Sequence, residues 1–337
     1  MTDKKEKSKL RFLPKGSALH RLSALITLLL LILIFSFTSN AFLSVNNSLT
    51  VLLQTSVIGL LAIGMTMVII TGGIDLSVGS VLALSGVVTG LLMKAGLPVM
   101  PAMAFGVVTG GFCGFLNGLV ITKMRITPFV ATLGMMMIAR GVALQLTGAA
   151  PISRLGETFG WLGNGALFRV VEMQGNGFPK VVFPGIPYPA ILLLIMAIYG
   201  SYLLQRRQIG RHIFSVGSNE EAARLSGVNV DRTKIWAYTA SGALAGLAGM
   251  VLMSRLVTVQ PNEGVMYELD AIAASVIGGA SLMGGIGSIS SSMIGAFIIG
   301  VLRNGLNMAG TSAFIQQIII GVVVIGAVYI DQIRNRK

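Results

Sequence analysis

The chain has 337 residues, of which 54% are hydrophobic and only 11% are charged, and it contains 43 glycines. Soluble globular domains carry about 25% charged residues, so this composition excludes a water-soluble protein and indicates a polytopic α-helical membrane protein. The formal net charge of +13 would suggest nucleic-acid binding in a soluble protein. Here the basic residues occupy short segments between apolar runs, where they orient the chain and meet anionic lipid. We therefore expect a membrane-lipid environment and no nucleic-acid partner.

Apolar runs long enough to cross a bilayer recur along the whole chain. The first run follows a basic segment, but it is long and no small-residue cleavage pattern follows it, so we expect an uncleaved span rather than a signal peptide. This divides the chain into a cytosolic basic tail, residues 1–21, and one transmembrane domain, residues 22–337. About ten spans are expected, near residues 22–38, 50–71, 78–93, 98–121, 128–147, 188–204, 235–257, 269–283, 287–305 and 313–330.

The distribution of basic residues predicts how the bundle is oriented. If the first span enters from the cytosol, most Lys and Arg residues fall in the tails and the inner segments. This asymmetry favours cytosolic termini and an even number of spans. Two polar segments interrupt the apolar pattern, an extracytoplasmic loop over residues 148–187 and a cytosolic loop over residues 205–234. The basic residues left on the outer side are Lys94, Arg154, Arg169 and Lys180.

An acidic residue lies between the second and third apolar runs. Gly72 and Gly73 break the preceding helix, and Asp75 or Ser77 could cap the next one. A carboxylate at the centre of a membrane helix costs roughly 2.5–3.5 kcal/mol, so Asp75 must lie at an aqueous end, line a wet cavity or have a partner. The expected topology places this join at the inner end of both spans, which favours a helix cap at the cytosolic edge. A broken helix that dips into a translocation path is the alternative.

The cytosolic loop contains a short helix with clear boundaries. Asn219 is a good N-cap, Glu220 and Arg224 are spaced i,i+4, and Gly227 suits a left-handed C-terminal cap. A helix of two turns is marginal in water, so it must either pack on the bundle or dock on a partner. The candidate docking residues are Asn219, Glu220, Glu221, Ala222, Ala223, Arg224, Leu225 and Gly227.

Polar residues within the predicted spans are candidates for the wall of a solute pathway. A hydroxylated solute needs hydrogen-bond donors and acceptors rather than fixed charge, but each of these residues could equally bond a neighbouring helix at roughly 0.6–2 kcal/mol. Arg140 is expected to pair with a carbonyl or carboxylate, or to reach water. The candidates for the pathway are Gln54, Asp75, Ser77, Asn117, Thr132, Asn304 and Asn307; Thr55 and Gln145 share their character.

A second acidic group lies at the predicted outer start of the eighth span. Glu268 and Asp270 would be stabilised there by the helix dipole alone. Together with Gln260 and Glu263 they are also candidates for docking a binding protein at the outer mouth of the bundle. No Lys or Arg lies near Tyr267 in this segment, which would suit a partner that presents basic residues.

Several motifs of catalytic proteins are absent from the sequence. The chain has no Gly-x-x-x-x-Gly-Lys-Ser/Thr segment and no Gly-x-Ser-x-Gly segment, which argues against a P-loop ATPase and an intramembrane serine hydrolase. Its only histidines, His20 and His212, fall in cytosolic segments and do not suggest a buried metal site. We therefore expect a protein that is not an enzyme and that uses no cofactor or metal.

Four segments resemble one protein family. They are GMTMVIITGGIDLSVGSVLALSG, TPFVATL, NEEAARLSGV and YELDAIAASVIGGASLMGG, and they are similar to the permease subunits of bacterial ribose-type ABC sugar importers. The resemblance implies an all-α fold of about ten transmembrane helices, of the type shared by ribose and vitamin B12 importers. It also implies location in the bacterial cytoplasmic membrane, a homodimer, a separate cytosolic ATPase and an extracytoplasmic sugar-binding protein.

The resemblance also implies a role for the short cytosolic helix. Importer permeases often carry Glu-Ala-Ala followed by Gly in the loop that docks on the ATPase, and Glu221-Ala222-Ala223 with Gly227 matches this pattern. Ribose or another monosaccharide is the expected solute, although sugar choice in such systems rests largely with the binding protein. An ion-coupled secondary transporter of a small polar solute is the alternative, but such carriers place ionisable residues deep in their spans, and no deep carboxylate pair is predicted here.

Overall fold

The computed structural model describes residues 15–173 and 179–335, and these are mostly helical. Most of the basic tail expected over residues 1–21 lies outside the described residues, as do residues 336–337. The first part of the chain forms α1 (Lys15–Thr38), α2 (Val45–Ile70), α3 (Val78–Lys94), α4 (Val99–Lys123) and α5 (Pro128–Thr147). The last part forms α7 (Tyr188–Arg206), α8 (Gln208–Ser218), α9 (Glu220–Leu225), α10 (Val230–Leu256), α11 (Tyr267–Ile277), α12 (Ile289–Met308) and α13 (Ala313–Asn335).

The helices differ in how completely they could cross a bilayer. Among the described residues, α2, α4, α5, α7, α10 and α12 have the length and hydropathy of a membrane span. The apolar stretches of α1, α3 and α13 are shorter, and α11 has only 11 residues. Each of the ten expected spans coincides with a helix. The expected number of complete crossings is nevertheless not confirmed, because α3 and α11 both begin inside the bundle.

Helix α10 lies at the centre of the bundle and packs most extensively on α4 and α2. Close approach to α4 is possible because that helix carries a glycine at every fourth position from residue 106 to residue 118. A Cβ at Gly110 would overlap the carbonyl oxygen of Gly242 on α10, and a Cβ at Gly242 would overlap that of Gly110. Small residues allow such backbone contact in lipid, where packing rather than water exclusion holds helices together. The glycines of α4 and α10 thus allow these two helices to pack with their backbones in contact.

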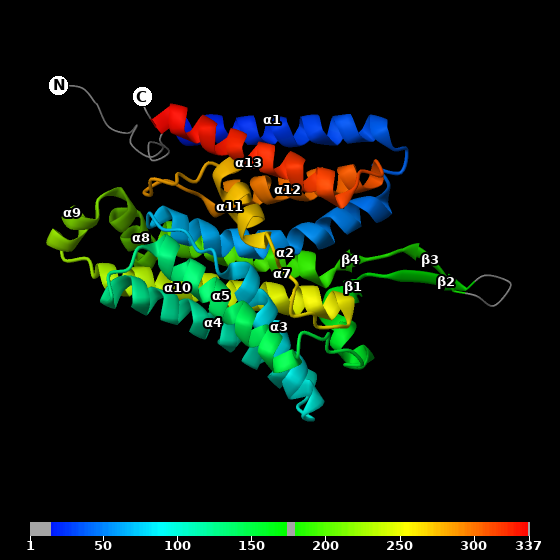
Figure 1. Cartoon of the computed structure of the whole chain (residues 1–337). Helices are drawn as coiled ribbons and strands as arrows, with labels where there is room; N and C mark the ends of the chain where they lie inside the picture. Colours follow the sequence, from blue (N-terminus) through cyan, green and yellow to red (C-terminus); the bar gives the residue numbers. More distant parts are fainter. Residues whose placement is uncertain (1–14, 174–178, 336–337) are drawn as a thin grey trace, which may run out of the picture.

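The bundle has two distinct ends (Figure 1). One end carries α8 and α9, and we call it the α9 end. The opposite end carries the strand pair β2–β3, and we call it the hairpin end. Helix α13 finishes at the α9 end, beside the start of α1 (Figure 1). Both ends of the described chain therefore lie at the same end of the bundle, as an even number of passes requires.

The segment over residues 148–187 has regular structure of its own. It contains η1 (Glu157–Gly160), α6 (Trp161–Asn164) and the short strands β1 (Ala166–Leu167), β2 (Val170–Met173), β3 (Pro179–Phe183) and β4 (Ile186–Pro187). The strands pair antiparallel as β1–β4 and β2–β3, so the expected all-α fold carries a small β element. Ser254 on α10 fastens the segment, because its hydroxyl donates to Phe159 O at 2.6 Å and accepts from Gly163 N at 2.8 Å. The segment therefore packs on the hairpin end of α10.

The join between α2 and α3 does not lie at the end of the bundle. Tyr238 and Ser241 of α10 contact Gly73 and Asp75, and Ser241 is eleven residues from the start of α10 at Val230. At 1.5 Å per residue this is about 16 Å along the helix. The expectation of a join at the cytosolic edge is thus corrected, because the chain turns back into the bundle after α2 and begins α3 in the interior.

Helix α11 also begins in the interior. The loop before it pairs Val259 with Ile152 near the hairpin end and then follows α3 inward until Gly264 lies against Gly79. Gly90, which packs on Val259, is eleven residues from Gly79, so the loop descends about 16 Å along α3. The acidic start of α11 therefore lies within the bundle and not at its outer surface, where it was expected.

Candidate functional site

Helix α9 has the boundaries that the sequence predicts. The Asn219 side chain accepts a hydrogen bond from Ala222 N at 2.9 Å, and Gly227 takes a left-handed conformation with φ of 83°. Ala223 is buried against Val216 of α8 and Val230 of α10. The inner face of this short helix is thus held by the bundle, which explains how two turns remain folded.

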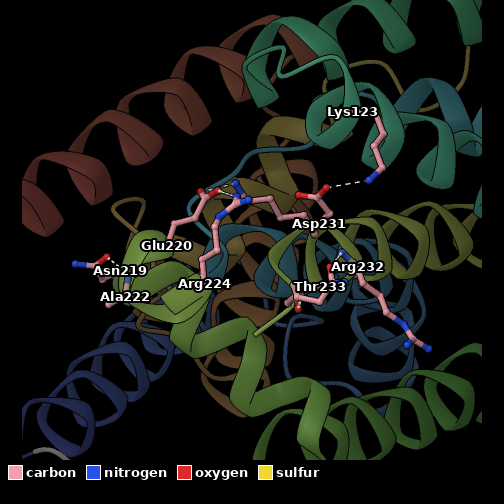
Figure 2. A network of polar contacts seen from close by, with 10 residues as sticks. Lys123, Asn219, Glu220, Ala222, Arg224, Asp231, Arg232 and Thr233 are labelled. Atoms are coloured by element: carbon pink, nitrogen blue, oxygen red, sulfur yellow. Dashed lines mark hydrogen bonds and ion pairs between the residues drawn. The ribbon is translucent and has the colours of Figure 1, made fainter. Parts of the chain in front are cut away.

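Ion pairs hold the other side of α9 (Figure 2). Glu220 pairs with Arg224 at 3.4 Å and with Lys234 of α10 at 2.6 Å, and the Lys234 side chain is only 17% exposed. Nearby, Lys123 at the end of α4 pairs with Asp231 of α10 at 3.0 Å (Figure 2). A polar cavity of about 530 Å³ lies between α9, the start of α10 and the turn between α4 and α5.

The outward face of α9 carries an apolar side chain in an otherwise polar region. Leu225 is 85% exposed, and Glu221 and Arg224 beside it are exposed as well. The face formed by Glu221, Arg224 and Leu225 is called the α9 face below.

The pair between Glu220 and Lys234 is expected to position α9. Lys234→Glu should place two carboxylates together and lower transport about two- to fivefold, as expected for a partly exposed pair worth about 0.5–1 kcal/mol. Uptake of labelled solute per inserted protein measures this effect. The reversed pair Lys234→Glu/Glu220→Lys should restore most of the activity, and failure of the double variant to recover would contradict a positioning role.

Helix α8 meets two distant loops at its C-terminal end. A Cβ at Gly217 would overlap the carbonyl oxygen of Ile70, the last residue of α2. The same oxygen accepts a hydrogen bond from Gly285 N at 2.9 Å, and Gly285 belongs to the loop between α11 and α12. The backbones of Ile70, Gly217 and Gly285 thus touch directly, and we call this contact the glycine junction. It connects the segment that carries α9 to the end of α2 and to the loop between α11 and α12.

The carboxylate of Asp75 is enclosed by hydrogen-bond donors. Its Oδ1 accepts from Ser77 N at 3.1 Å and from Ser77 Oγ at 2.6 Å, and its Oδ2 accepts from Ser241 Oγ at 2.9 Å. Asn117 on α4 donates to Ser77 Oγ at 2.9 Å, and Thr132 on α5 donates to Ile74 O at 3.3 Å. All these side chains are at most 1% exposed, so the group joins three helices, α4, α5 and α10, to the α2–α3 turn rather than facing an open path.

A second cavity, of about 230 Å³, lies in the half of the bundle nearer the hairpin end. Two arginines and several uncharged polar side chains line it, and we call it the arginine cavity. Apolar atoms of Val57, Ile58, Leu252 and Gly300 complete its wall. The polar residues around it come from α2, α10, α11, α12 and α13, and they are Gln54, Arg255, Tyr267, Arg303, Asn307 and Gln316.

A buried ion pair lies behind this cavity. Arg303 Nη2 contacts Asp270 Oδ2 at 2.6 Å, and Asp270 is 1% exposed. The pair joins α11 to α12. Asp270 was expected to meet a binding protein at the outer surface, whereas the structure places its side chain in the interior, where it pairs with Arg303.

The other pathway candidates divide into two groups. Gln54 and Asn307, two of the polar residues considered for the pathway, line the arginine cavity. Asn304 instead forms a reciprocal amide pair with Asn47 at 3.0 Å, which fastens α12 to the start of α2. The structure thus brings two candidates together at a cavity and places Asn304, like the Asp75 group, in contacts between helices.

The remaining candidates for docking lie on the loop before α11 and on the first turn of that helix. Gln260 is exposed, whereas Glu263 and Glu268 are half-buried. Arg140 on α5 holds this loop, because its guanidinium donates to the carbonyl oxygens of Pro261 and, at 2.8 Å, of Glu263. Of the partners expected for Arg140, a carbonyl, a carboxylate or water, the structure shows carbonyl oxygens.

Sequence reasoning did not select Arg255, Arg303 or Tyr267 as pathway residues. A signal was nevertheless present, because ionisable residues within membrane helices are rare and mark solute paths or paired sites. The sequence does not show that three helices bring these side chains to one cavity.

Comparison with known proteins agrees with this architecture. The family model described as branched-chain amino acid transport system / permease component matches residues 47–328. The chain is 41% identical over 318 residues to the ribose import permease protein RbsC of Escherichia coli (strain K12), covering 93% of each chain. It is 41% identical to the RbsC protein of Bacillus subtilis (strain 168), again covering 93% of each chain.

A further relative is the xylose transport system permease protein XylH of Escherichia coli (strain K12), which is 33% identical over 91% of this chain and 90% of its own. No solved structure matches the chain. These relatives are permease components, which form a membrane passage and do not catalyse a reaction themselves. With its apolar helices and a match over most of its length, the chain belongs to this family of ABC importer permeases.

Proposed function

We propose that this protein is the transmembrane permease subunit of an ATP-driven importer for ribose or a related monosaccharide. The observation that carries the proposal is the 41% identity, over 93% of the chain, to ribose import permeases of two distant bacteria. A second copy of the chain would complete the translocation pathway in the bacterial cytoplasmic membrane, through ten passes of which α3 and α11 are partial. Lipid would cover the exposed apolar faces of α1, α5 and α13.

The proposed orientation places the α9 end in the cytosol and the hairpin end outside. It is supported by the basic residues, because Lys123, Arg206, Arg224 and Lys234 all lie at the α9 end. Basic residues concentrate on the cytoplasmic side of membrane proteins. In this orientation both termini are cytosolic, and Gln260 and Glu263, on the loop before α11, face the extracytoplasmic side, where a sugar-binding protein would dock.

The α9 face is the proposed contact with a cytosolic ATPase. Ala223 holds the helix to the bundle, which leaves Glu221 and Leu225 for a groove in the partner. ATP-driven movement of that partner would reach α2 and α11 through the glycine junction. The pathway itself would run by Gln54 and Asn307, while Asp75, Ser77, Asn117, Thr132 and Asn304 hold the surrounding helices in place.

Co-purification tests the proposed partner. Tagged protein isolated in gentle detergent from its host should carry an ATPase in near-equal amount, identified by mass spectrometry. Leu225→Glu should remove most of that ATPase, because a carboxylate would be buried unpaired in the docking groove. The matched control is Leu167→Glu, which changes an exposed leucine at the hairpin end and should leave the complex intact.

The alternative is an ion-coupled secondary transporter. It would be favoured if the purified protein lacked an ATPase and moved solute into liposomes under an ion gradient alone. The described structure offers one membrane ion pair, Asp270–Arg303, that such a mechanism could use. The match to importer permeases over most of the chain favours the ATP-driven function.

A further inference from the structure

The arginine cavity has the size and lining of a site for a small polar solute. Its volume of about 230 Å³ is below the 300–1,000 Å³ typical of pockets for drug-sized ligands, so it suits a smaller molecule. Amide side chains of Gln54, Asn307 and Gln316 offer both donors and acceptors, and the Tyr267 ring and hydroxyl border the same space. This combination can bond several hydroxyl groups of one ligand.

Unsatisfied polar atoms lie on Arg303, which lines the cavity, and on two residues beside the lining. Among the described residues, four buried side-chain polar atoms have no hydrogen-bond partner, and three of them belong to Thr55, Asp270 and Arg303. Thr55 packs against Gly300, which lines the cavity, and Asp270 lies behind Arg303. Buried polar groups in native proteins are nearly always bonded, so such a cluster requires an explanation. A polar ligand that enters the cavity and lets these groups rearrange supplies one.

The charge of the lining restricts the ligand further. The lining residues include two arginines and no carboxylate. Asp270 compensates Arg303, but among the described residues Arg255 has no carboxylate within 4.0 Å. A guanidinium without a counter-charge next to a cavity attracts neutral hydrogen-bond acceptors and anions, and it repels cations.

We propose that the arginine cavity is a solute site within each permease subunit, in which Arg255 and Arg303 donate hydrogen bonds to the hydroxyl oxygens of a neutral monosaccharide. This deepens the proposed function and rests on it. The site lies between the loop that faces the binding protein and the interior start of α11, so a sugar released outside would meet it first. A solute that carries an amine would be excluded by the unpaired Arg255.

Transport by the reconstituted complex tests the proposal. The permease, its ATPase and its binding protein are placed in liposomes, and uptake of labelled ribose is measured together with ATP hydrolysis stimulated by the binding protein. Arg255→Gln should lower uptake at least about tenfold, since hydrogen bonds from charged donors are strong, while stimulated ATP hydrolysis stays within about twofold. The matched control, Arg154→Gln, alters an exposed arginine at the same end and should change neither quantity.

A labelling experiment tests the cavity without relying on transport. The only native cysteine, Cys113, is buried, and Asn307 is exposed at the cavity, so Asn307→Cys introduces an accessible thiol. Its reaction rates with anionic and cationic methanethiosulfonates are compared with those of Leu167→Cys on the surface. The anionic reagent should be favoured at residue 307, ribose should slow the reaction there, and Arg255→Gln should remove the preference.

The outcomes separate this inference from the proposed function. If the wild-type complex imports no monosaccharide, the proposed function fails. If it imports ribose but Arg255→Gln transports normally, the cavity is not a solute site. Equal reaction of both reagents at residue 307, with no protection by ribose, would overturn the inference even if Arg255→Gln failed to fold.

Discussion

Gly217→Val is expected to abolish solute uptake without removing the ATPase from the complex. Any Cβ at residue 217 would overlap the carbonyl oxygen of Ile70 and would lie 2.6 Å from Gly285 N, which donates to that oxygen. Backbone atoms cannot rotate away as a side chain can, so α8 must separate from α2 or the hydrogen bond must break. Overpacking of this kind costs about 1–3 kcal/mol, which is enough to uncouple α9 from the bundle.

The measurement compares three quantities in membranes that contain Gly217→Val. We expect uptake to fall at least about tenfold and the ATPase to co-purify normally, because the α9 face is unchanged. ATP hydrolysis should continue but should no longer respond to the binding protein. Gly134→Ala on α5 is the control, since nothing lies within 4 Å of a Cβ at that position. Normal uptake by Gly217→Val would show that the glycine junction does not transmit movement.

Asp75→Ala is expected to reduce folded protein and transport in parallel. The substitution removes the acceptor of three hydrogen bonds from Ser77 and Ser241 in a fully buried site. Leaving these donors without partners should lower the free energy of unfolding by about 2–4 kcal/mol. Asp75→Asn keeps one carbonyl oxygen and should cost about 1 kcal/mol.

Thermal unfolding in detergent, together with uptake per folded molecule, measures the effect at Asp75. The control is Asp231→Ala, which removes an exposed ion pair with Lys123 and should change stability by less than about 1 kcal/mol. If Asp75→Ala folded to the normal level and still failed to transport, the carboxylate would act on the solute. The structural role described above would then be wrong.

Features of α9 that depend only on neighbouring residues could be predicted from the sequence. The N-cap of Asn219, the left-handed Gly227 and the pair between Glu220 and Arg224 all depend on residues within one or two helical turns. Their geometry follows from backbone hydrogen bonding and charge at short range. The apolar runs likewise located the long helices to within a few residues.

Depth within the bundle was not predictable in the same way. A count of apolar residues treats every run as a full crossing, so α3 and α11 were expected to begin at the surface. Their true starting points depend on Gly79 and Gly264, whose backbones meet although they are far apart in the sequence. For the same reason Asp270 lies in the interior and not at the expected outer surface, and it pairs with Arg303.

The sequence by itself determined that the chain is a helical membrane protein, which family it resembles and where α9 begins and ends. These properties arise from composition, from hydrophobic length and from contacts between neighbouring residues. Only the tertiary structure decided that Asp75 is a buried acceptor and that Arg255, Arg303, Gln54 and Asn307 share one cavity. Such arrangements depend on how the helices of one bundle are staggered and rotated against each other. That packing is set by close contacts between distant glycines and by buried pairs, and neither leaves a periodic signal in the chain.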